Sequence, residues 1–247
     1  MNDFNRGVIG GASDTDVGLK SFMLGTYRWM ALAMAVTATV AFLVGQAMMA
    51  NPALIGLVYN PVTAIVMFLM VVFGFGAIGR KLPTMSMGGV LAFLFGFAAF
   101  MGVFMSAYAT AFYSPTIVAK IFFMTVAMFA ALSMFGYTTK FDLGAIVKYA
   151  IAAFFAYILV GFVGMFVPAL SVFDGGVFGM VINIIALAAI AIITAWETQM
   201  LKRVYYGLAG TGDAALMNKY SAFGAASLLL AFINMFTILM NLFGGRE

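Results

Sequence analysis

The sequence predicts an all-α membrane protein, a bundle of seven transmembrane helices. Of its 247 residues, 65% are hydrophobic and only 8% are charged, which is typical of membrane proteins and far from the composition of water-soluble domains. Seven apolar runs follow one another along the chain, and an α-helix of roughly 20 apolar residues is long enough to cross the hydrocarbon core of a bilayer. Composition and run length therefore favour a polytopic membrane protein over any soluble fold.

The seven spans are separated by short connections. We predict them, in chain order, at about residues 28–49, 62–79, 88–112, 116–137, 144–168, 177–200 and 222–243. Each connection contains proline, glycine or charge, the residues that end apolar helices. The connections are Asn51-Pro52 with Asn60-Pro61, Arg80 to Pro83, Ser114-Pro115, Thr138 to Asp142, Pro168 to Gly176, and Lys202 to Lys219.

The chain begins with a polar stretch that is not part of a span. We expect residues 1–24 to be a cytoplasmic N-terminal tail and residues 25–247 to be the seven-helix transmembrane domain. The apolar run after Arg28 is longer than the hydrophobic part of a signal peptide and lacks a small-residue cleavage site, so we expect it to stay in the membrane.

Lysine and arginine are distributed very unevenly between the two sides of the predicted bundle. With seven spans, ten of the twelve fall on the side of the N-terminus, against Lys120 and Arg246 opposite. The ten are Arg6, Lys20, Arg28, Arg80, Lys81, Lys140, Lys148, Lys202, Arg203 and Lys219. Because basic residues accumulate on the cytoplasmic side of membrane proteins, we predict a multi-pass protein of the bacterial inner membrane with a cytoplasmic N-terminus and an external C-terminus. The net charge of +4 then reflects orientation in the lipid bilayer, and we expect no nucleic-acid partner.

Several classes of chemistry are excluded by missing residues. The chain has no cysteine and no histidine, which removes disulfides, thiolate or imidazole metal sites and histidine-based nucleophile pairs. Intramembrane aspartyl proteases need two membrane aspartates, and a retinal pump needs a lysine in its last span. Neither requirement is met. We therefore expect no enzyme activity and no cofactor.

Glu197 is the one carboxylate inside a predicted span. An acid in a membrane is costly and is by default a functional candidate whose partner must be found. A simpler interpretation is an acid near the membrane edge that reaches toward headgroup water and is balanced by Lys202 and Arg203. Those cations lie five and six residues along the chain, so they do not form the favourable pair at i+4. Arg80 becomes a candidate partner if the second and sixth helices are neighbours.

Several segments resemble the bacterial members of the Bax inhibitor-1 family, and the match extends over almost the whole chain. The resemblance rests on Tyr27 to Met30, Phe135 to Lys140, Thr194 to Gln199, Lys219 to Ser221 and Phe232 to Phe236. It implies seven helices with the last surrounded by the others, and a pH-sensitive calcium leak. In that family, two acids on the sixth and seventh helices share a proton, and an arginine of the second helix locks the closed state.

The resemblance transfers only partly to this chain. Glu197 matches the first acid and Arg80 is the counterpart of the arginine, but Ala231 stands where the second acid is expected. One carboxylate cannot titrate as a coupled pair, and calcium takes six to eight oxygens. Glu197 and Arg80 are thus the candidate ion- and pH-sensing residues. Glu197 is a weak candidate ligand for calcium, and the candidate supporting residues are Thr198, Gln199, Asn234 and Ala231. We predict a leak with altered gating.

A second class of function remains open. Small residues inside the spans, such as Gly74, Gly161 and Gly224, allow close approach of helices. The alternative is therefore a non-conducting regulator that binds other membrane proteins, for example a membrane protease complex.

Overall fold

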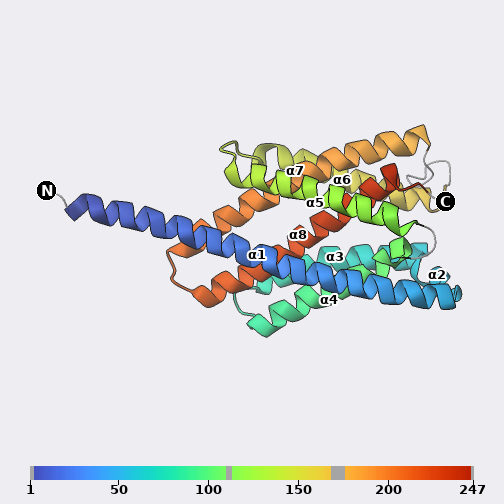
Figure 1. Ribbon diagram of the computed structural model, residues 1–247, viewed down its shortest axis with the longest axis horizontal. Coiled ribbons are helices and arrows are strands. Elements are labelled where there is room, and N and C mark those ends of the chain that lie inside the picture. Colours follow the sequence, from blue (N-terminus) through green and yellow to red (C-terminus); the bar gives the residue numbers. More distant parts are fainter. Residues whose placement is uncertain (1–2, 110–112, 168–175, 246–247) are drawn as a thin grey trace.

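The chain folds into a helical bundle built around its last helix. The computed structural model describes residues 3–109, 113–167 and 176–245, with side chains from residue 17 onward. The elements are α1 (Asp3–Ala50), α2 (Ala53–Val58), α3 (Pro61–Lys81), α4 (Met87–Met105), the 3₁₀ turn η1 (Ser106–Ala109), α5 (Pro115–Thr138), α6 (Gly144–Gly164), α7 (Val177–Ala209) and α8 (Ala214–Phe243). Helices α1, α3 and α4 lie on one side of α8, and α5, α6 and α7 lie on the other (Figure 1).

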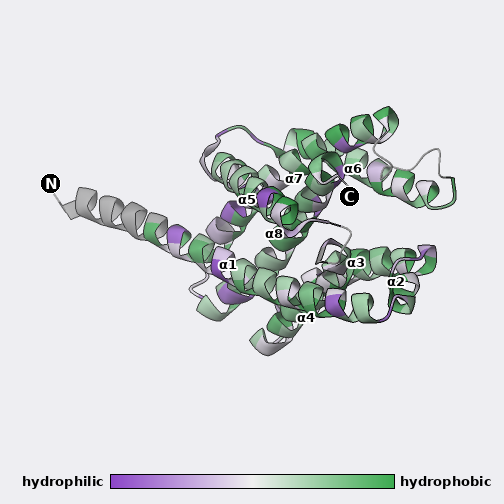
Figure 2. Cartoon of the chain, turned by 45° about the vertical axis from the view of Figure 1, so that its right-hand side comes forward, coloured by the Kyte–Doolittle hydropathy of each residue, from purple (hydrophilic) through white to green (hydrophobic). Residues whose placement is uncertain are grey.

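Seven helices are long and apolar enough to cross a membrane within the described residues, so the predicted fold class and number of spans are confirmed. Hydrophobic residues dominate along these helices, and hydrophilic residues gather mainly toward their ends and connections (Figure 2). The predicted span ends at residues 112 and 168 lie outside the described residues. Helix α7 continues beyond the predicted end of the sixth span at residue 200, to Ala209.

The N-terminal segment is helical. Helix α1 is 48 residues long, which corresponds to about 72 Å at 1.5 Å per residue, more than twice the thickness of a hydrocarbon core. Its first turns project beyond the other helices (Figure 1). Leu19, Phe22 and Met23 are buried, so the packed part of α1 begins inside the stretch expected to be a tail.

Helix α8 forms the core because it presents small and apolar side chains in every direction. Ala222, Ala225 and Ala226 are fully buried, and small residues let neighbouring helices approach closely. Helix α8 packs against α1, α4, α5 and α7. In contrast, α3 has no buried residue, which places it on the outside of the bundle.

Polar side chains cap the N-termini of two of the helices, α3 and α8. Asn60 precedes Pro61 at the start of α3 and accepts a hydrogen bond from the Thr63 amide at 3.0 Å. Asp213 does the same for the Leu216 amide at the start of α8, at 2.8 Å. Such caps satisfy amides that have no partner within the helix.

The connections that carry basic residues meet at one end of the bundle, which we call the basic end. There, Lys219 at the start of α8 donates to the Pro83 carbonyl in the connection between α3 and α4, at 3.2 Å. Lys202 of α7 donates to the Tyr137 carbonyl near the end of α5, at 3.1 Å. These contacts join α8 to the connection between α3 and α4, and α7 to the end of α5.

Candidate functional site

The candidate site lies where α7 packs against α8. The Ser227 hydroxyl on α8 donates to Oε1 of Glu197 on α7 at 2.9 Å. The other carboxylate oxygen, Oε2, is buried and has no hydrogen-bond partner among the described residues. Leaving a buried polar atom without a partner costs about 1–3 kcal/mol, and more for a charged group. The carboxyl is thus held between two helices by one of its two oxygens.

The nearest cations of α7 do not balance this carboxyl. Lys202 binds the Tyr137 carbonyl, and Arg203 forms an ion pair with Asp142 at 2.5 Å. The interpretation of Glu197 as an acid at the membrane edge, paired loosely with these two residues, therefore does not describe the structure. Its carboxyl instead faces α8.

The Arg80 side chain also does not bind the Glu197 carboxyl. It is exposed, and its Nε donates to the Gly76 carbonyl one turn back on α3 at 3.0 Å. The ion pair expected between Arg80 and Glu197 is not formed. The physical reason is the position of α3 outside the bundle, where its aromatic contacts are with α4, α6 and α8.

Thr198 and Gln199 follow Glu197 in sequence but point to other neighbours, because successive side chains on a helix diverge by about 100°. The Thr198 hydroxyl donates to the Ser133 hydroxyl of α5 at 3.3 Å. The Gln199 side chain accepts from the Leu143 amide at 3.1 Å and donates to the Phe141 carbonyl at 2.8 Å. These two residues hold α5 and the connection from α5 to α6, and they do not bind the Glu197 carboxyl.

A second polar cluster joins α7 and α8 near the opposite end of the bundle. Asn241 of α8 lies 3.4 Å from Asn183 of α7 and 3.4 Å from the Tyr157 hydroxyl of α6, which itself donates to Asn183 at 3.2 Å. Asn183 lies fourteen residues before Glu197, and Asn241 lies fourteen residues after Ser227. The two clusters therefore share one antiparallel register and are about 21 Å apart along the interface.

Metal ligation can be judged from the side chains present. No group of three or more histidine, cysteine, aspartate or glutamate side chains that could hold a metal occurs among the described residues. A calcium ion at Glu197 would need the Ser227 hydroxyl, backbone carbonyls and water to complete its six to eight oxygens.

Comparison with known proteins identifies the chain. Residues 19–247 match the family model described as inhibitor of apoptosis-promoting Bax1. The chain belongs to the Bax inhibitor-1 family. It is 32% identical to an uncharacterized protein of Caulobacter vibrioides over the full length of both chains. It is 29% identical to the inner membrane protein YbhL of Escherichia coli over 93% of this chain and 94% of that protein. A membrane protein of Streptococcus pyogenes is also 29% identical, over 95% of this chain and 97% of its own.

In this Bax inhibitor-1 protein, the predicted position of a second acid, Ala231, lies close to the hydroxyl that binds Glu197. Ala231 is buried on α8, and Ser227 lies one turn before it on the same face. Ser227, and not Ala231, is the α8 residue that donates a hydrogen bond to Glu197. Asn234 lies on that face one turn beyond Ala231 and makes no hydrogen bond to Glu197. The predicted supporting set is therefore replaced by Ser227, which sequence reasoning missed.

The connection between α5 and α6 is fastened to α7 by an exposed ion pair. Arg203 donates to Asp142 Oδ1, and this hydrogen bond, together with one from the Gly144 amide, holds the pKa of the Asp142 carboxyl below its usual value. A lowered pKa means that the contact stabilises the fold at neutral pH and is lost as the pH falls through the pKa of the folded state.

We expect Asp142→Asn to speed amide hydrogen exchange several-fold in residues 139–143 at neutral pH, because the loop loses this contact. In the wild type, the protection factor of these residues, which corrects for the slower intrinsic exchange in acid, should fall by the same ratio only under strongly acidic conditions. Asp213→Asn, which changes an acid in another connection, should leave exchange in residues 139–143 unchanged. Equal exchange in wild type and Asp142→Asn at neutral pH would show that the ion pair does not hold the loop.

Proposed function

We propose that this protein is a pH-sensitive cation leak pathway of the bacterial inner membrane, with calcium as the ion and Glu197 as the titrating group. The observation that carries the proposal is the Glu197 carboxyl, bonded through one oxygen to Ser227 while the other oxygen is buried without a partner. A proton, a water molecule or a cation that reaches Oε2 gives it the missing partner. In this proposal the protein has no catalytic role.

The polar groups of the α7–α8 interface support a route for ions. Glu197 and Ser227 form one polar layer, and Asn183 and Asn241 form a second layer in the same register. By that register, Asn234 falls between them. Ions cross a membrane protein where polar groups replace part of their hydration shell at several weak sites in succession. A single carboxylate gives a weak calcium site. A weak site releases the ion quickly, as transport through the protein requires.

Gating in this proposal differs from that of an acid pair. Because Ala231 provides no carboxyl and Ser227 only a hydroxyl, Glu197 titrates as a single group rather than as a coupled pair. Arg80, which is bonded to its own helix, does not act as a lock. We propose the orientation given by the basic residues, with the N-terminus in the cytoplasm.

Reconstitution tests the proposal. Liposomes that contain the purified protein and an entrapped calcium indicator should take up calcium faster than protein-free liposomes, and the rate should change between acidic and neutral pH. Uptake no faster than the lipid background at any pH would overturn the proposal.

A regulator that binds other membrane proteins is the second candidate. Helix α3 favours this candidate. It is long enough to span the membrane, has no buried residue, and exposes Phe73 and Val62. Such a surface can pack against another membrane protein. Absence of flux combined with recovery of one discrete membrane partner from crosslinked cells would support the regulator over the leak.

A further inference from the structure

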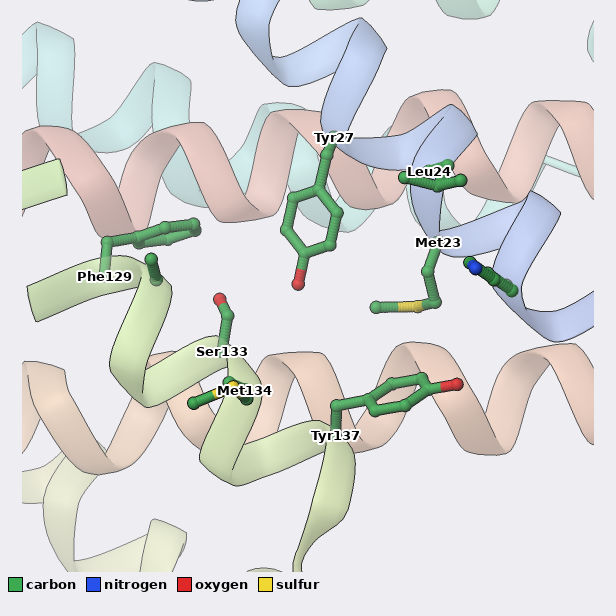
Figure 3. Close-up of a pocket in the computed structure, with 9 residues that line it drawn as sticks. Met23, Leu24, Tyr27, Phe129, Ser133, Met134 and Tyr137 are labelled. Carbon is green, nitrogen blue, oxygen red and sulfur yellow. The ribbon is translucent and has the colours of Figure 1, made fainter. Parts of the chain in front are cut away.

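A hollow opens between α1 and α5 near the basic end. Both helices pack against α8, which leaves a gap between them of about 480 Å³. Figure 3 shows side chains of both helices on either side of this gap, with the Tyr27 hydroxyl directed toward α5 and the Ser133 hydroxyl directed toward α1. Leu24 and Met134, at its rim, are 48% and 67% exposed. The hollow is therefore open along its side to the surrounding lipid.

A second hollow lies between the same two helices, farther toward the opposite end, and the Phe232 ring stands between the two hollows. It measures about 210 Å³ and is lined by Ala41 of α1, Val118 of α5 and Phe236 of α8, among others. The Phe232 ring of α8 lies 5.7 Å from the Phe129 ring, which lines the first hollow, and 5.7 Å from the Phe122 ring, which lines the second. From Lys20 to Ala41, α1 rises about 32 Å, close to the thickness of the hydrocarbon core. The two hollows together therefore extend along α1 over a length close to that of a membrane span.

The chemistry of the gap changes from one end to the other. Its walls are apolar along most of their length, but the Lys20 ammonium lies at the basic end. A second ammonium, that of Lys202, lies 5.3 Å from the centre of the Tyr137 ring, which lines the same end. No acidic side chain is among the residues that line the first hollow. An apolar slot with cations at its mouth complements an acyl chain that carries a negative headgroup.

We propose that the gap between α1 and α5 binds one anionic phospholipid, with an acyl chain between the helices and its phosphate at Lys20. The lipid comes from the leaflet at the basic end, because the cations lie there. The site is independent of any transport activity, since it uses neither Glu197 nor Ser227. It lies close to them, however, because Ser133 in its wall accepts the hydrogen bond of Thr198.

Native mass spectrometry of the full-length protein tests this proposal. Protein released from micelles that contain equal amounts of phosphatidylglycerol and phosphatidylcholine with the same acyl chains should retain one phosphatidylglycerol. Lys20→Ala should weaken retention about fivefold, as expected for one cation near a lipid phosphate. Ala130→Trp, which fills the hollow from α5, should abolish retention.

Two matched variants control for general effects. Lys148→Ala removes another exposed lysine near the same end, and Ala131→Trp adds the same bulk to the neighbouring exposed position of α5, outside the lining of the hollow. Both should retain the lipid like the wild type. Retention that is equal for the two lipids, or unchanged in Ala130→Trp, would overturn the proposal. Equal weakening of phosphatidylglycerol retention by Lys148→Ala and Lys20→Ala would also contradict the proposal. Circular dichroism checks that each variant is folded.

Discussion

Replacing Glu197 with glutamine is expected to abolish the pH dependence of calcium flux in proteoliposomes. Glutamine has nearly the same shape and can still accept the Ser227 hydrogen bond, but it cannot lose a proton. The variant therefore imitates the protonated carboxyl at every pH. Its flux should equal the flux of the wild type at the acidic end of the series and should stay constant as the pH rises.

Two further variants separate this role from a general effect of charge. Asp213→Asn removes an exposed acid that caps α8 and should keep the pH dependence of the wild type. Ser227→Ala removes the hydrogen bond that Ser227 donates to the carboxyl, worth about 1.5–3 kcal/mol when the acceptor is charged. It should move the midpoint of the pH response while preserving the response itself. A Glu197→Gln protein whose flux still follows pH like the wild type would refute the role of Glu197.

Gly136→Ala is expected to cause the largest loss of stability among single small substitutions. Gly136 of α5 lies so close to α7 that an added Cβ would overlap the backbone carbonyl of Ala195. A backbone atom cannot turn aside as a side chain can, so the two helices must separate. Overpacking of this kind costs about 1–3 kcal/mol and sometimes more, and we expect a value near the upper end. Unfolding in mixed micelles with increasing dodecyl sulfate measures the loss.

Gly161→Ala is the matched control. It makes the same chemical change in the last turn of α6, where nothing lies within 4 Å of the added atom. Alanine favours a helix over glycine by about 1 kcal/mol, so this variant should be as stable as the wild type or slightly more so. Because Ala195 lies two residues before Glu197, Gly136→Ala should also disturb flux. Equal stability of the two variants would mean that α5 and α7 are not in close contact.

The fold could be predicted because it depends on quantities that a sequence contains. Seven apolar runs of sufficient length, separated by proline, glycine or charge, determine the number of spans. The end of α7 was harder to predict, because Lys202 and Arg203 mark the edge of an apolar run, whereas the helix itself continues to Ala209. Hydropathy reports where apolar residues stop, and a helix can continue into water beyond that point.

The site could be predicted only in part. Glu197 stands out because a lone acid in an apolar span is rare. Ser227 does not stand out, because serine is common in membrane helices and usually binds its own backbone or a neighbouring helix. Ser227 lies one helical turn from Ala231. This position indicates a contact with Glu197 only when the register of α7 against α8 is known. The expected pair with Arg80 depended on which helices are neighbours, and that information is not contained in the spacing of residues along one chain.

The central claim is that the Glu197 carboxyl, held between α7 and α8, gains and loses a proton as the flux changes. Infrared difference spectra of the reconstituted protein between acidic and neutral pH measure this directly through the carbonyl band of a protonated carboxyl. We predict a band in the wild type that titrates over the same pH range as calcium flux and is missing in Glu197→Gln. A band that is unchanged in Glu197→Gln, or that titrates outside the range of the flux, would contradict the claim.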